Sequence, residues 1–384
     1  MEPYVICGGE VWVDGAFTRR NLWIQNGKIC EVKSECDIPE TVRVVDASGI
    51  RVVPGFIDVH THGAAGKDVN ASTAEDLNHT IGKFFASQGT TSWLASVLTD
   101  TPEKTLWCID QVRQASQVPG DYAQLLGTHL EGPFLSMDYR GSMPAHLLQK
   151  GNRELLLQYI EAGKGTVRYV TLAPEVEGVL DMIPEISKHI RVAIGHSGAS
   201  YETAMAAIQA GAVSCTHTFN GMKLFHQHFP AIMGAVLETD VYCEAICDGR
   251  HLHPGTIRML LKCKGIDRVI GITDSIMAAG LPDGRYRLGV NDVVVTDGDA
   301  MLADGSSRAG STLTTGQAVK NVVHFTGRPL EEILPMYTTN PARMLGLEKQ
   351  KGKICSGYDA DLVFLDENMD VIRTFVGGRE VYRR

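Results

Sequence analysis

Two histidines stand one residue apart at the end of a short apolar stretch. The segment GFIDVHTHG places His60 and His62 directly after the run FIDV. Alternate residues of a strand face the same way, so both imidazole rings point to one side. A buried imidazole needs a polar partner, because burying an unpaired polar group costs free energy. Imidazole nitrogen binds zinc and iron well, and the pair therefore suggests a metal site.

More potential ligands stand at the ends of other apolar stretches. These are Glu131 in LLGTHLEG, His196 in VAIGHSG, His217 in VSCTHTFN and Asp274 in VIGITDS. Each has an ordinary explanation when taken alone: a buried histidine can bond to backbone, and Glu131 can bind the N–H groups of a loop. Asp274 can likewise serve as a helix N-cap. Their shared place at strand ends favours one metal site, in which each of these residues is a potential ligand or proton carrier.

The elements that must position these residues repeat in a cycle. After Pro54 the chain alternates a short apolar strand, a loop and a helical segment. Eight strands are expected, at FIDVHTH, TTSWLASV, LLGTHLEG, RYVTLAPE, VAIGHSG, VSCTHTFN, VYCEAICDG and VIGITDS. This is the period of an α/β protein with a (β/α)₈ TIM-like barrel, whose strands end together at one face. An open doubly wound sheet is the alternative, but no dinucleotide-binding fingerprint opens the first helix.

Local signals mark where several helices begin. The stretch from Ser72 to Glu75 has the spacing of a capping box. Thr101 precedes Pro102, as an N-cap precedes a proline at the first helical position. Asn152 is placed to cap the helix RELLLQYIEAG.

Both ends of the chain have the pattern of β-structure. Residues 1–53 alternate apolar and polar side chains, with hairpin turns at Asp14-Gly15 and Asn26-Gly27. Residues 346–384 have the same texture, with Gly377-Gly378 as a turn. We therefore predict a small β-sandwich domain built from residues 1–53 plus 346–384. The barrel would then occupy residues 54–345.

Composition excludes several classes of partner. The 384 residues are 44% hydrophobic and 21% charged, with a net charge of −9 and no run of Lys or Arg, which argues against nucleic-acid binding. Nine cysteines without a CxxC pair fit reduced thiols. There is no signal-peptide pattern and no apolar run long enough to span a membrane. We expect a cytoplasmic protein with no nucleic-acid or membrane partner.

The order of the motifs resembles the amidohydrolase superfamily and, within it, the N-acetylglucosamine-6-phosphate deacetylases. The matching motifs are His-x-His, HLEGPF, GHS, THTFN, TDSIMAAGLPDG and, near the C-terminus, GKICSGYDADLVFLD. The resemblance covers nearly the whole chain. HLEGP together with THxxN is fairly specific to this branch, whereas His-x-His is common to the superfamily.

The resemblance implies a metal centre. Glu131, His196 and His217 match the ligands that every member needs, and His60 with His62 match the pair of members that hold a second metal. It implies one or two divalent ions per subunit, with Glu131 as the bridge. Zinc and iron fit best, and manganese is also possible. Mononuclear members have Gln in place of the first histidine.

The resemblance also implies the reaction and its partners. The expected reaction is hydrolysis of the N-acetyl amide of N-acetylglucosamine 6-phosphate to glucosamine 6-phosphate and acetate, with Asp274 as the catalytic acid and base. The small amino-sugar substrate would be bound by a set of matching positions, and a homodimer with sites near its interface is expected. Those positions are Asn220, Gly221, His251, Ala309, Gly310 and Ser311.

Two positions depart from the family pattern within the expected substrate site. Many members carry KGAH, whose histidine polarises the acetyl carbonyl, where this chain has RGSM with Met143. Met cannot donate a useful hydrogen bond. Either a second metal replaces that histidine, or His146 moves in, or the substrate differs.

The second departure concerns the phosphate. The family motif REPG, whose Arg binds the 6-phosphate, reads HFPA here, with His228 at the Arg position. Arg carries a permanent charge, whereas His is only partly charged near neutral pH. Lys223, His226 and His228 together could form a weaker phosphate site. The alternative is that they belong to a polar loop at the dimer interface.

Other functions stay open at this stage. The same hydrolysis on another N-acetylated amino sugar, unphosphorylated or of galactosamine type, would use the same residues. Cyclic-amide hydrolases of this fold bridge their metals with a modified lysine, and no Lys stands at an expected strand end. A non-catalytic relative would be expected to lack Asp274 or a ligand, and neither is lost.

Overall fold

Eight parallel strands form the central sheet of the molecule. The computed structural model describes residues 2–34 and 38–384, so residues 1 and 35–37 of the predicted terminal domain lie outside the described residues. The strands neighbour one another in chain order: β8 (Phe56–Thr61), β11 (Thr90–Leu98), β12 (Gln124–Glu131), β13 (Val167–Leu172), β14 (Arg191–Ile194), β15 (Ala212–Cys215), β16 (Tyr242–Ile246) and β17 (Val269–Ile272). All eight coincide with the predicted stretches.

The first and last strands also meet, at their C-terminal ends. The N–H of Asp274 donates to the carbonyl of His60 at 2.9 Å, and the N–H of His62 donates to the carbonyl of Ser275 at 2.7 Å. The sheet therefore closes into a barrel, which confirms the predicted fold class. Every residue of β8 is buried, because side chains fill the barrel inside and helices cover it outside.

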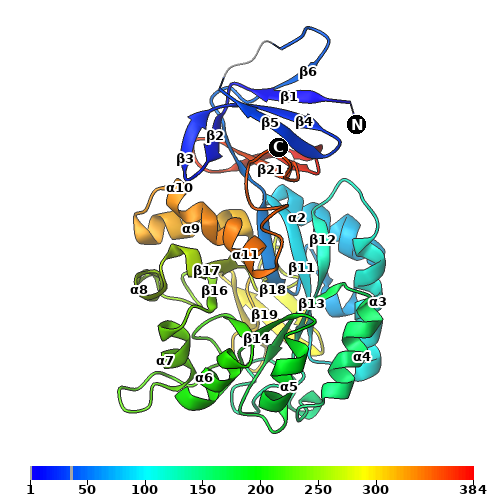
Figure 1. Cartoon of the computed structure of the whole chain (residues 1–384). Helices are drawn as coiled ribbons and strands as arrows, with labels where there is room; N and C mark the ends of the chain where they lie inside the picture. The colour runs from blue at the N-terminus through cyan, green and yellow to red at the C-terminus, as the bar shows by residue number, and fades with distance from the viewer. Residues whose placement is uncertain (1, 35–37) are drawn as a thin grey trace.

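Helices connect successive strands and surround the barrel (Figure 1). They are α2 (Lys83–Ser87), α3 (Pro102–Ser116), α4 (Arg153–Gly163), α5 (Val179–Ile186), α6 (Tyr201–Gln209), α7 (Ala231–Glu238), α8 (Pro254–Lys264) and α9 (Thr315–Thr326), followed by α10 (Leu330–Ile333) and α11 (Thr339–Met344). Thr101 and Asn152 cap α3 and α4 as predicted. The predicted capping box is wrong by one residue: Thr73 caps the short α1 (Ala74–Asp76) and pairs with Asp76.

Strands from both ends of the chain form a separate β-sandwich, which lies above the barrel and holds both termini (Figure 1). One sheet has the order β5 (Lys28–Lys33), β4 (Asn21–Gln25), β1 (Tyr4–Cys7), β6 (Arg43–Asp46). The other has the order β23 (Arg379–Arg383), β22 (Val371–Val376), β21 (Leu362–Leu365), β7 (Arg51–Pro54), β2 (Glu10–Val13), β3 (Ala16–Arg19). Leu22 and Ile24 of the first sheet share one apolar core with Leu362 and Phe364 of the second. The domain bounds 1–53 plus 346–384 and 54–345 stay a prediction.

The orientation of β8 separates the sandwich from the C-terminal face of the barrel. Strand β7 ends at Pro54 and β8 begins at Phe56, so the sandwich joins the barrel at the N-terminal end of its first strand. The C-terminal ends of the parallel strands point away from it. Functional residues of barrels gather at that far end.

A small antiparallel sheet, which the sequence did not lead us to expect, lies between β17 and α9. It consists of β18 (Gly284–Leu288), β19 (Asn291–Thr296) and β20 (Asp299–Leu302). Its apolar residues share a core with residues that follow barrel strands: Leu288, Val293 and Val295 pack in one cluster with Leu135 and Met143. The sheet therefore covers part of the barrel mouth.

Membrane-spanning segments were also sought among the helices. None in residues 2–34 and 38–384 combines the length and the apolar character that crossing a bilayer requires.

Candidate active site

Six side chains with nitrogen or oxygen donors converge at the mouth of the barrel, and each comes from the C-terminal end of a strand. They are His60 in β8, His62 just after it, Glu131 at the end of β12, His196 after β14, His217 after β15 and Asp274 after β17. All six are buried, with exposed fractions from 0% for His60 to 7% for Asp274. The structure therefore brings together all the residues that the sequence marked as metal ligands or proton carrier.

The backbone turns sharply at three of these residues. His196, His217 and Asp274 have φ angles of 47°, 26° and 48°, in the left-handed region. That region costs a residue with a side chain about 1–2 kcal/mol. The cost is accepted at residues that must point inward where a strand stops, and such strain is typical of functional sites.

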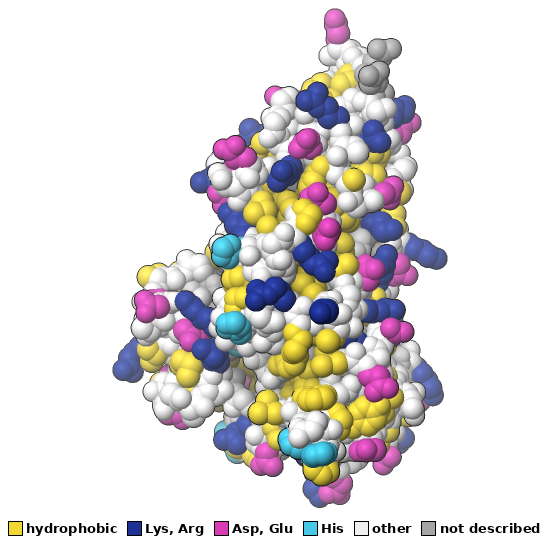
Figure 2. Space-filling view, turned by 90° about the vertical axis from the view of Figure 1, so that its left-hand side faces the viewer, with side chains coloured by type: hydrophobic (Ala, Val, Ile, Leu, Met, Phe, Trp, Pro, Cys, Tyr) yellow, Lys and Arg dark blue, Asp and Glu magenta, His cyan; other side chains and the backbone are white. Residues whose placement is uncertain are grey.

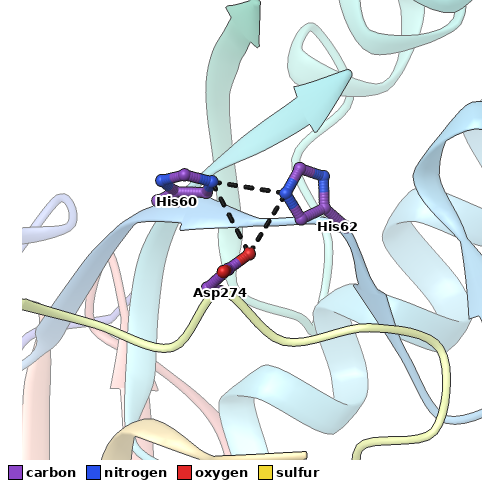
Figure 3. Close-up of side chains that lie close together, drawn as sticks. All are labelled: His60, His62 and Asp274. Atoms are coloured by element: carbon purple, nitrogen blue, oxygen red, sulfur yellow. Dashed lines mark hydrogen bonds and ion pairs between the residues drawn. The ribbon is translucent and has the colours of Figure 1, made fainter. Parts of the chain in front are cut away.

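The first group of donors consists of His60, His62 and Asp274 (Figure 3). The Nε2 atoms of the two histidines lie 3.3 Å apart. Oδ1 of Asp274 lies 3.2 Å from Nε2 of His62 and 3.6 Å from Nε2 of His60. Three donor atoms from β8 and the end of β17 thus face one small volume.

The second group consists of Glu131, His196 and His217. The two histidine Nε2 atoms are 2.9 Å apart, and Oε1 of Glu131 lies 3.1 Å from the first and 3.2 Å from the second. Glu131 also reaches the first group, because its Oε2 lies 3.1 Å from Nε2 of His62. Glu131 therefore lies between the two groups.

Hydrogen bonds on the far side of each ring decide which nitrogen faces the centre. Nδ1 of His62 donates to the carbonyl of Ser96 at 3.0 Å, and Nδ1 of His196 donates to the carbonyl of Tyr139 at 2.9 Å. A carbonyl oxygen only accepts, so the proton is on Nδ1 and the Nε2 atoms present lone pairs. These lone pairs point toward other donor atoms of the same kind.

This donor set fits a divalent metal ion. The Nε2 atoms of His196 and His217 lie 2.9 Å apart, and each lies within 3.2 Å of Oε1 of Glu131, so three atoms able to donate a lone pair converge on one volume that a cation would occupy. Imidazole and carboxylate ligands suit zinc, iron and manganese. The second group, Glu131, His196 and His217, supplies three protein ligands, which is the number typical of catalytic zinc sites.

The carboxylates make this volume strongly attractive to positive charge. Burial acts to lower the pKa of His62, but hydrogen bonds to Asp274 and Glu131 outweigh it and raise the pKa to about 9, so Nε2 holds a proton at neutral pH unless a bound cation takes its place. Burial acts to raise the pKa of Asp274, but His60 and His62 lower it below the ordinary value. Asp274 is therefore ionised at neutral pH.

Two buried carboxylates support the site, and the sequence analysis did not single them out. Asp58 of β8 accepts from the hydroxyl of Thr273 at 2.5 Å and so links β8 to β17, while burial raises its pKa to about 6. Glu244 of β16 accepts from Nδ1 of His60 at 3.0 Å. A charged residue inside an apolar strand, as in FIDVHTH and VYCEAICDG, was the available signal.

A pocket opens over the donors and contains five of the predicted substrate positions. Its lining includes Met143, Asn220, Gly221, His251 and Gly310, together with five of the six donors. Met143 is 3% exposed and presents an apolar wall. His251 is held by Asp248, which accepts from its Nδ1 at 2.7 Å.

Gly221 and Gly310 have φ angles of 57° and 60° and little space around them. A Cβ atom on Gly221 would lie 3.0 Å from Nδ1 of His196, and one on Gly310 would lie 2.8 Å from the carbonyl oxygen of Asp274. Glycine lets the two loops approach the donors closely.

Ala309, Ser311 and His228 do not line this pocket. Ala309 and Ser311 are buried, and Ser311 instead holds the chain around Asp274: its N–H donates to the carbonyl of Asp274 at 2.7 Å. Its hydroxyl donates to the carbonyl of Thr273 at 2.6 Å. His146, considered as a substitute for the missing family histidine, is exposed and outside the pocket lining as well.

His228 lies on an exposed loop between β15 and α7, which projects at the lower left of Figure 1. The loop also exposes large apolar side chains: Leu224 is 79% exposed, Phe225 56% and Phe229 71%. Hydrophobic and histidine side chains gather at the lower end of the face seen in Figure 2. The loop is therefore not purely polar.

Arg308 is a pocket residue that the sequence analysis did not single out. It lines the pocket together with Ser307 and Gly310, and it is the single Arg or Lys among the lining residues described. Asp299 binds its guanidinium with both carboxylate oxygens, each at 2.9 Å. The sequence shows Arg308 in the RAGST segment, but it did not predict the sheet β18–β20 that precedes this residue and places it at the pocket.

Comparison with known proteins agrees with this geometry. The model of the amidohydrolase family matches residues 51–381. The chain belongs to the amidohydrolase family. This amidohydrolase is 36% identical to the N-acetylglucosamine-6-phosphate deacetylase of Lysinibacillus sphaericus, over 95% of this chain and 94% of that protein. It is 34% identical to the N-acetylgalactosamine-6-phosphate deacetylase of Escherichia coli O157:H7, over 96% of each chain.

A solved structure is similar over the full length. The amidohydrolase superposes with a TM-score of 0.92 and 32% identity on the D267A mutant of N-acetyl-D-glucosamine-6-phosphate deacetylase from Mycobacterium smegmatis, bound to N-acetyl-D-glucosamine 6-phosphate. The match covers 99% of this chain and 100% of the other. The predicted family and fold are confirmed.

Proposed function

We propose that this chain hydrolyses the N-acetyl amide of N-acetylglucosamine 6-phosphate and releases glucosamine 6-phosphate and acetate. The observation that carries the proposal is the pair of donor groups that meet at Glu131, beside Asp274, at the floor of the pocket. Membership of the amidohydrolase family and relatives named as deacetylases support it. A solved relative bound to that sugar phosphate supports the substrate.

The family and the two donor groups point to a divalent metal. We propose His60, His62, Glu131, His196 and His217 as its ligands, with two ions per chain and zinc or iron ahead of manganese. When bound, such an ion lowers the pKa of a coordinated water toward neutral and polarises an amide carbonyl. The chain's own contribution is to hold the donors in place and to move protons.

Asp274 is the proposed general base and acid. Its carboxylate is ionised at neutral pH and lies at the pocket floor, so its Oδ1 can accept a proton from the attacking water. The same atom can then give that proton to the departing amine nitrogen. The loop that contains Ser311 keeps Asp274 in position through two backbone hydrogen bonds: the N–H of Ser311 donates to the carbonyl of Asp274, and the N–H of Ile276 donates to the carbonyl of Ser311.

The remaining pocket residues bind the sugar. Asn220, Gly221, His251 and Gly310 line the space above the donors. The Nδ1 proton of His251 is bonded to Asp248, which leaves its Nε2 as an acceptor for a sugar hydroxyl. Ala309 and Ser311 serve by fixing Gly310 rather than by contact. Met143 excludes water from the acetyl group but donates no hydrogen bond to it.

We place the 6-phosphate toward Arg308 rather than His228. Arg308 lines the pocket, while His228 lies on the exposed loop and does not. Arg presents a planar fork that suits phosphate oxygens. Since Asp299 occupies one edge of that fork, the other edge remains for the ligand.

N-acetylgalactosamine 6-phosphate is the second candidate substrate. A relative of nearly the same identity is named for that sugar, which differs from the glucose form in the orientation of one hydroxyl. Initial rates of acetate release from both sugar phosphates and from free N-acetylglucosamine test the choice. We expect the glucose-type phosphate to give the highest kcat/KM. A preference for the free sugar would overturn the phosphate assignment.

We further propose a homodimer formed through the exposed loop between β15 and α7. Leu224, Phe225 and Phe229 on this loop expose three large apolar side chains close together in the sequence, as protein–protein contact sites often do. A cytoplasmic location is proposed as well, because the eight cysteines among the described residues are free thiols. Sedimentation of the protein with Phe229→Ser tests the dimer, with loss of the dimer as the expected result.

A further inference from the structure

Glu244 is a fully buried carboxylate behind the first donor group, and the proposed reaction gives it no role. Its side chain is 0% exposed, and it lies on β16. It accepts three hydrogen bonds: from Nδ1 of His60 at 3.0 Å, from the backbone N–H of His217 at 3.1 Å and from the hydroxyl of Tyr169 at 2.6 Å. No Lys or Arg forms an ion pair with it among the described residues.

The four histidines of the centre differ in what supports their rings. His62 and His196 donate from Nδ1 to neutral backbone carbonyls. Nδ1 of His217 is buried with no hydrogen-bond partner in the described part of the chain. His60 alone donates to a carboxylate.

We infer that Glu244 is a positioning residue that makes the first donor group, His60, His62 and Asp274, strong enough to hold its own ion. The inference rests on the proposed function only in that both require the same metal centre.

The negative charge of Glu244 explains why the first group would bind a cation more strongly. A carboxylate that accepts the Nδ1 proton fixes the ring and makes the opposite Nε2 a better donor toward a cation. The first group has one carboxylate of its own, Asp274, and shares Glu131 with the second group. Glu244 adds a third negative charge next to it, and the low dielectric of a fully buried position keeps that charge effective.

The contact with His217 is different in kind. There Glu244 meets the backbone N–H and not the ring, so it orients the chain after β15 without changing the basicity of that imidazole. A Gln at position 244 can still accept from this N–H and from His60, because its carbonyl oxygen has two acceptor sites. Glu244→Gln thus removes the charge and keeps the shape.

The experiment is a competitive chelator titration of the full-length protein loaded with Zn²⁺, with metal content per chain measured after dialysis. We expect two ions in the unmodified protein. In Glu244→Gln one ion should bind about 10–100-fold more weakly, as loss of such supporting groups usually causes, while the other keeps its affinity. If Glu244→Gln binds each of the two ions as tightly as the unmodified protein does, the inference is wrong.

Two controls separate charge from structure. His60→Gln removes the first group, so adding Glu244→Gln to it should leave the affinity of the remaining ion unchanged; a further loss would show a general structural role. Tyr169→Phe removes one hydrogen bond to Glu244 but keeps its charge, and should retain both ions.

A conservative variant supplies the third comparison. Glu244→Asp keeps the charge and shortens the side chain, so we expect it to bind the weaker ion better than Glu244→Gln does. The reverse order would favour a purely structural role and contradict the inference. Because metal content is measured without substrate, the result is independent of the sugar. Failure of the proposed function would instead appear as no acetate release from the parent protein carrying both ions.

Discussion

The barrel mouth and the sandwich both contain clusters of charged or ionisable side chains, but they arrange them in opposite ways. In the sandwich, Glu380 accepts hydrogen bonds from Arg373 at 2.7 and 3.0 Å and from Arg383 at 2.5 and 2.8 Å, so opposite charges pair. At the barrel mouth, the Nε2 atoms of His196 and His217 lie 2.9 Å apart, and both lie beside the carboxylate of Glu131. In the sandwich the opposite charges neutralise one another. The barrel mouth has an arrangement that an added cation would stabilise further.

The two regions therefore serve different purposes, catalysis at the barrel mouth and stability in the sandwich. Residues at the mouth adopt left-handed backbone conformations and place polar groups close together. Both features cost stability, and they position the donors for metal binding and catalysis. The sandwich uses paired charges and an apolar core, which favour stability. Substitutions at the mouth should therefore reduce turnover and leave folding intact, while substitutions in the sandwich should do the reverse.

The largest effect on turnover is expected from Asp274→Asn. Losing a general base and acid should lower kcat by about 10²–10⁴-fold, because Asn cannot carry the proton. The protein should still fold, although its free energy of unfolding should fall somewhat because Asn no longer forms the buried ion pair with His62. Acetate release and urea unfolding measure the two quantities. Turnover close to that of the parent would remove Asp274 from the mechanism.

The largest effect on stability is expected from Phe364→Ala in the sandwich. Phe364 is 1% exposed and packs in the core shared by the two sheets. Truncation should cost about 3–5 kcal/mol of unfolding free energy through lost burial and the cavity left behind. The kcat of the folded fraction should stay unchanged. A drop in kcat as large as that of Asp274→Asn would contradict the separation of stability and catalysis between the two regions.

A smaller effect is expected at the edge of the pocket, from Arg308→Leu. Loss of charge-assisted hydrogen bonds to phosphate, worth about 1.5–3 kcal/mol, corresponds to about 10–100-fold in kcat/KM for the phosphorylated sugar. Activity on free N-acetylglucosamine should barely change. Lys223→Leu on the exposed loop serves as the matched control and should leave the preference as it is. If instead the loop variant alone loses the preference, the phosphate lies there.

The smallest effect is expected from Glu380→Gln and depends on pH. Partial burial acts to raise the pKa of Glu380, but Arg383 and Arg373 outweigh it and lower the pKa from 4.5 to about 2. A lowered pKa stabilises the folded state above pH 4.5, and this stabilisation is lost as the pH falls from there toward 2. We expect the variant to be about 1 kcal/mol less stable at pH 7. The difference should vanish near pH 2, and a gap that persists there would rule out the charge as its cause.

The sequence predicted the parts of the molecule in which local pattern and chemistry coincide. Each barrel strand is a short apolar run with a turn after it, and the donors stand at those run ends, so His60, Glu131 and Asp274 could be placed together from topology alone. Sequence spacing could not show that Glu244 meets His60, because the two come from strands on different parts of the barrel wall.

Loops were harder to predict than strands. The turn residues of the sheet β18–β20 are also common in irregular loops, so the sequence did not distinguish a sheet from a loop here. Packing around Met143 and Leu288 places this sheet over the barrel mouth. The same sheet places Arg308 in the pocket and leaves Ser311 behind it. The error at Ser72 has a local cause, since Ser72 and Thr73 are both good caps and tertiary contacts choose between them.

Dependence of acetate release on bound metal is the most direct test of the account. Protein stripped with a chelator, with its residual metal counted, should release acetate from N-acetylglucosamine 6-phosphate at a small fraction of the original rate. The rate should return as Zn²⁺ or Fe²⁺ is added back, in step with the ions bound per chain. Stripped protein that keeps the full rate would contradict the role assigned to the six donors at the barrel mouth.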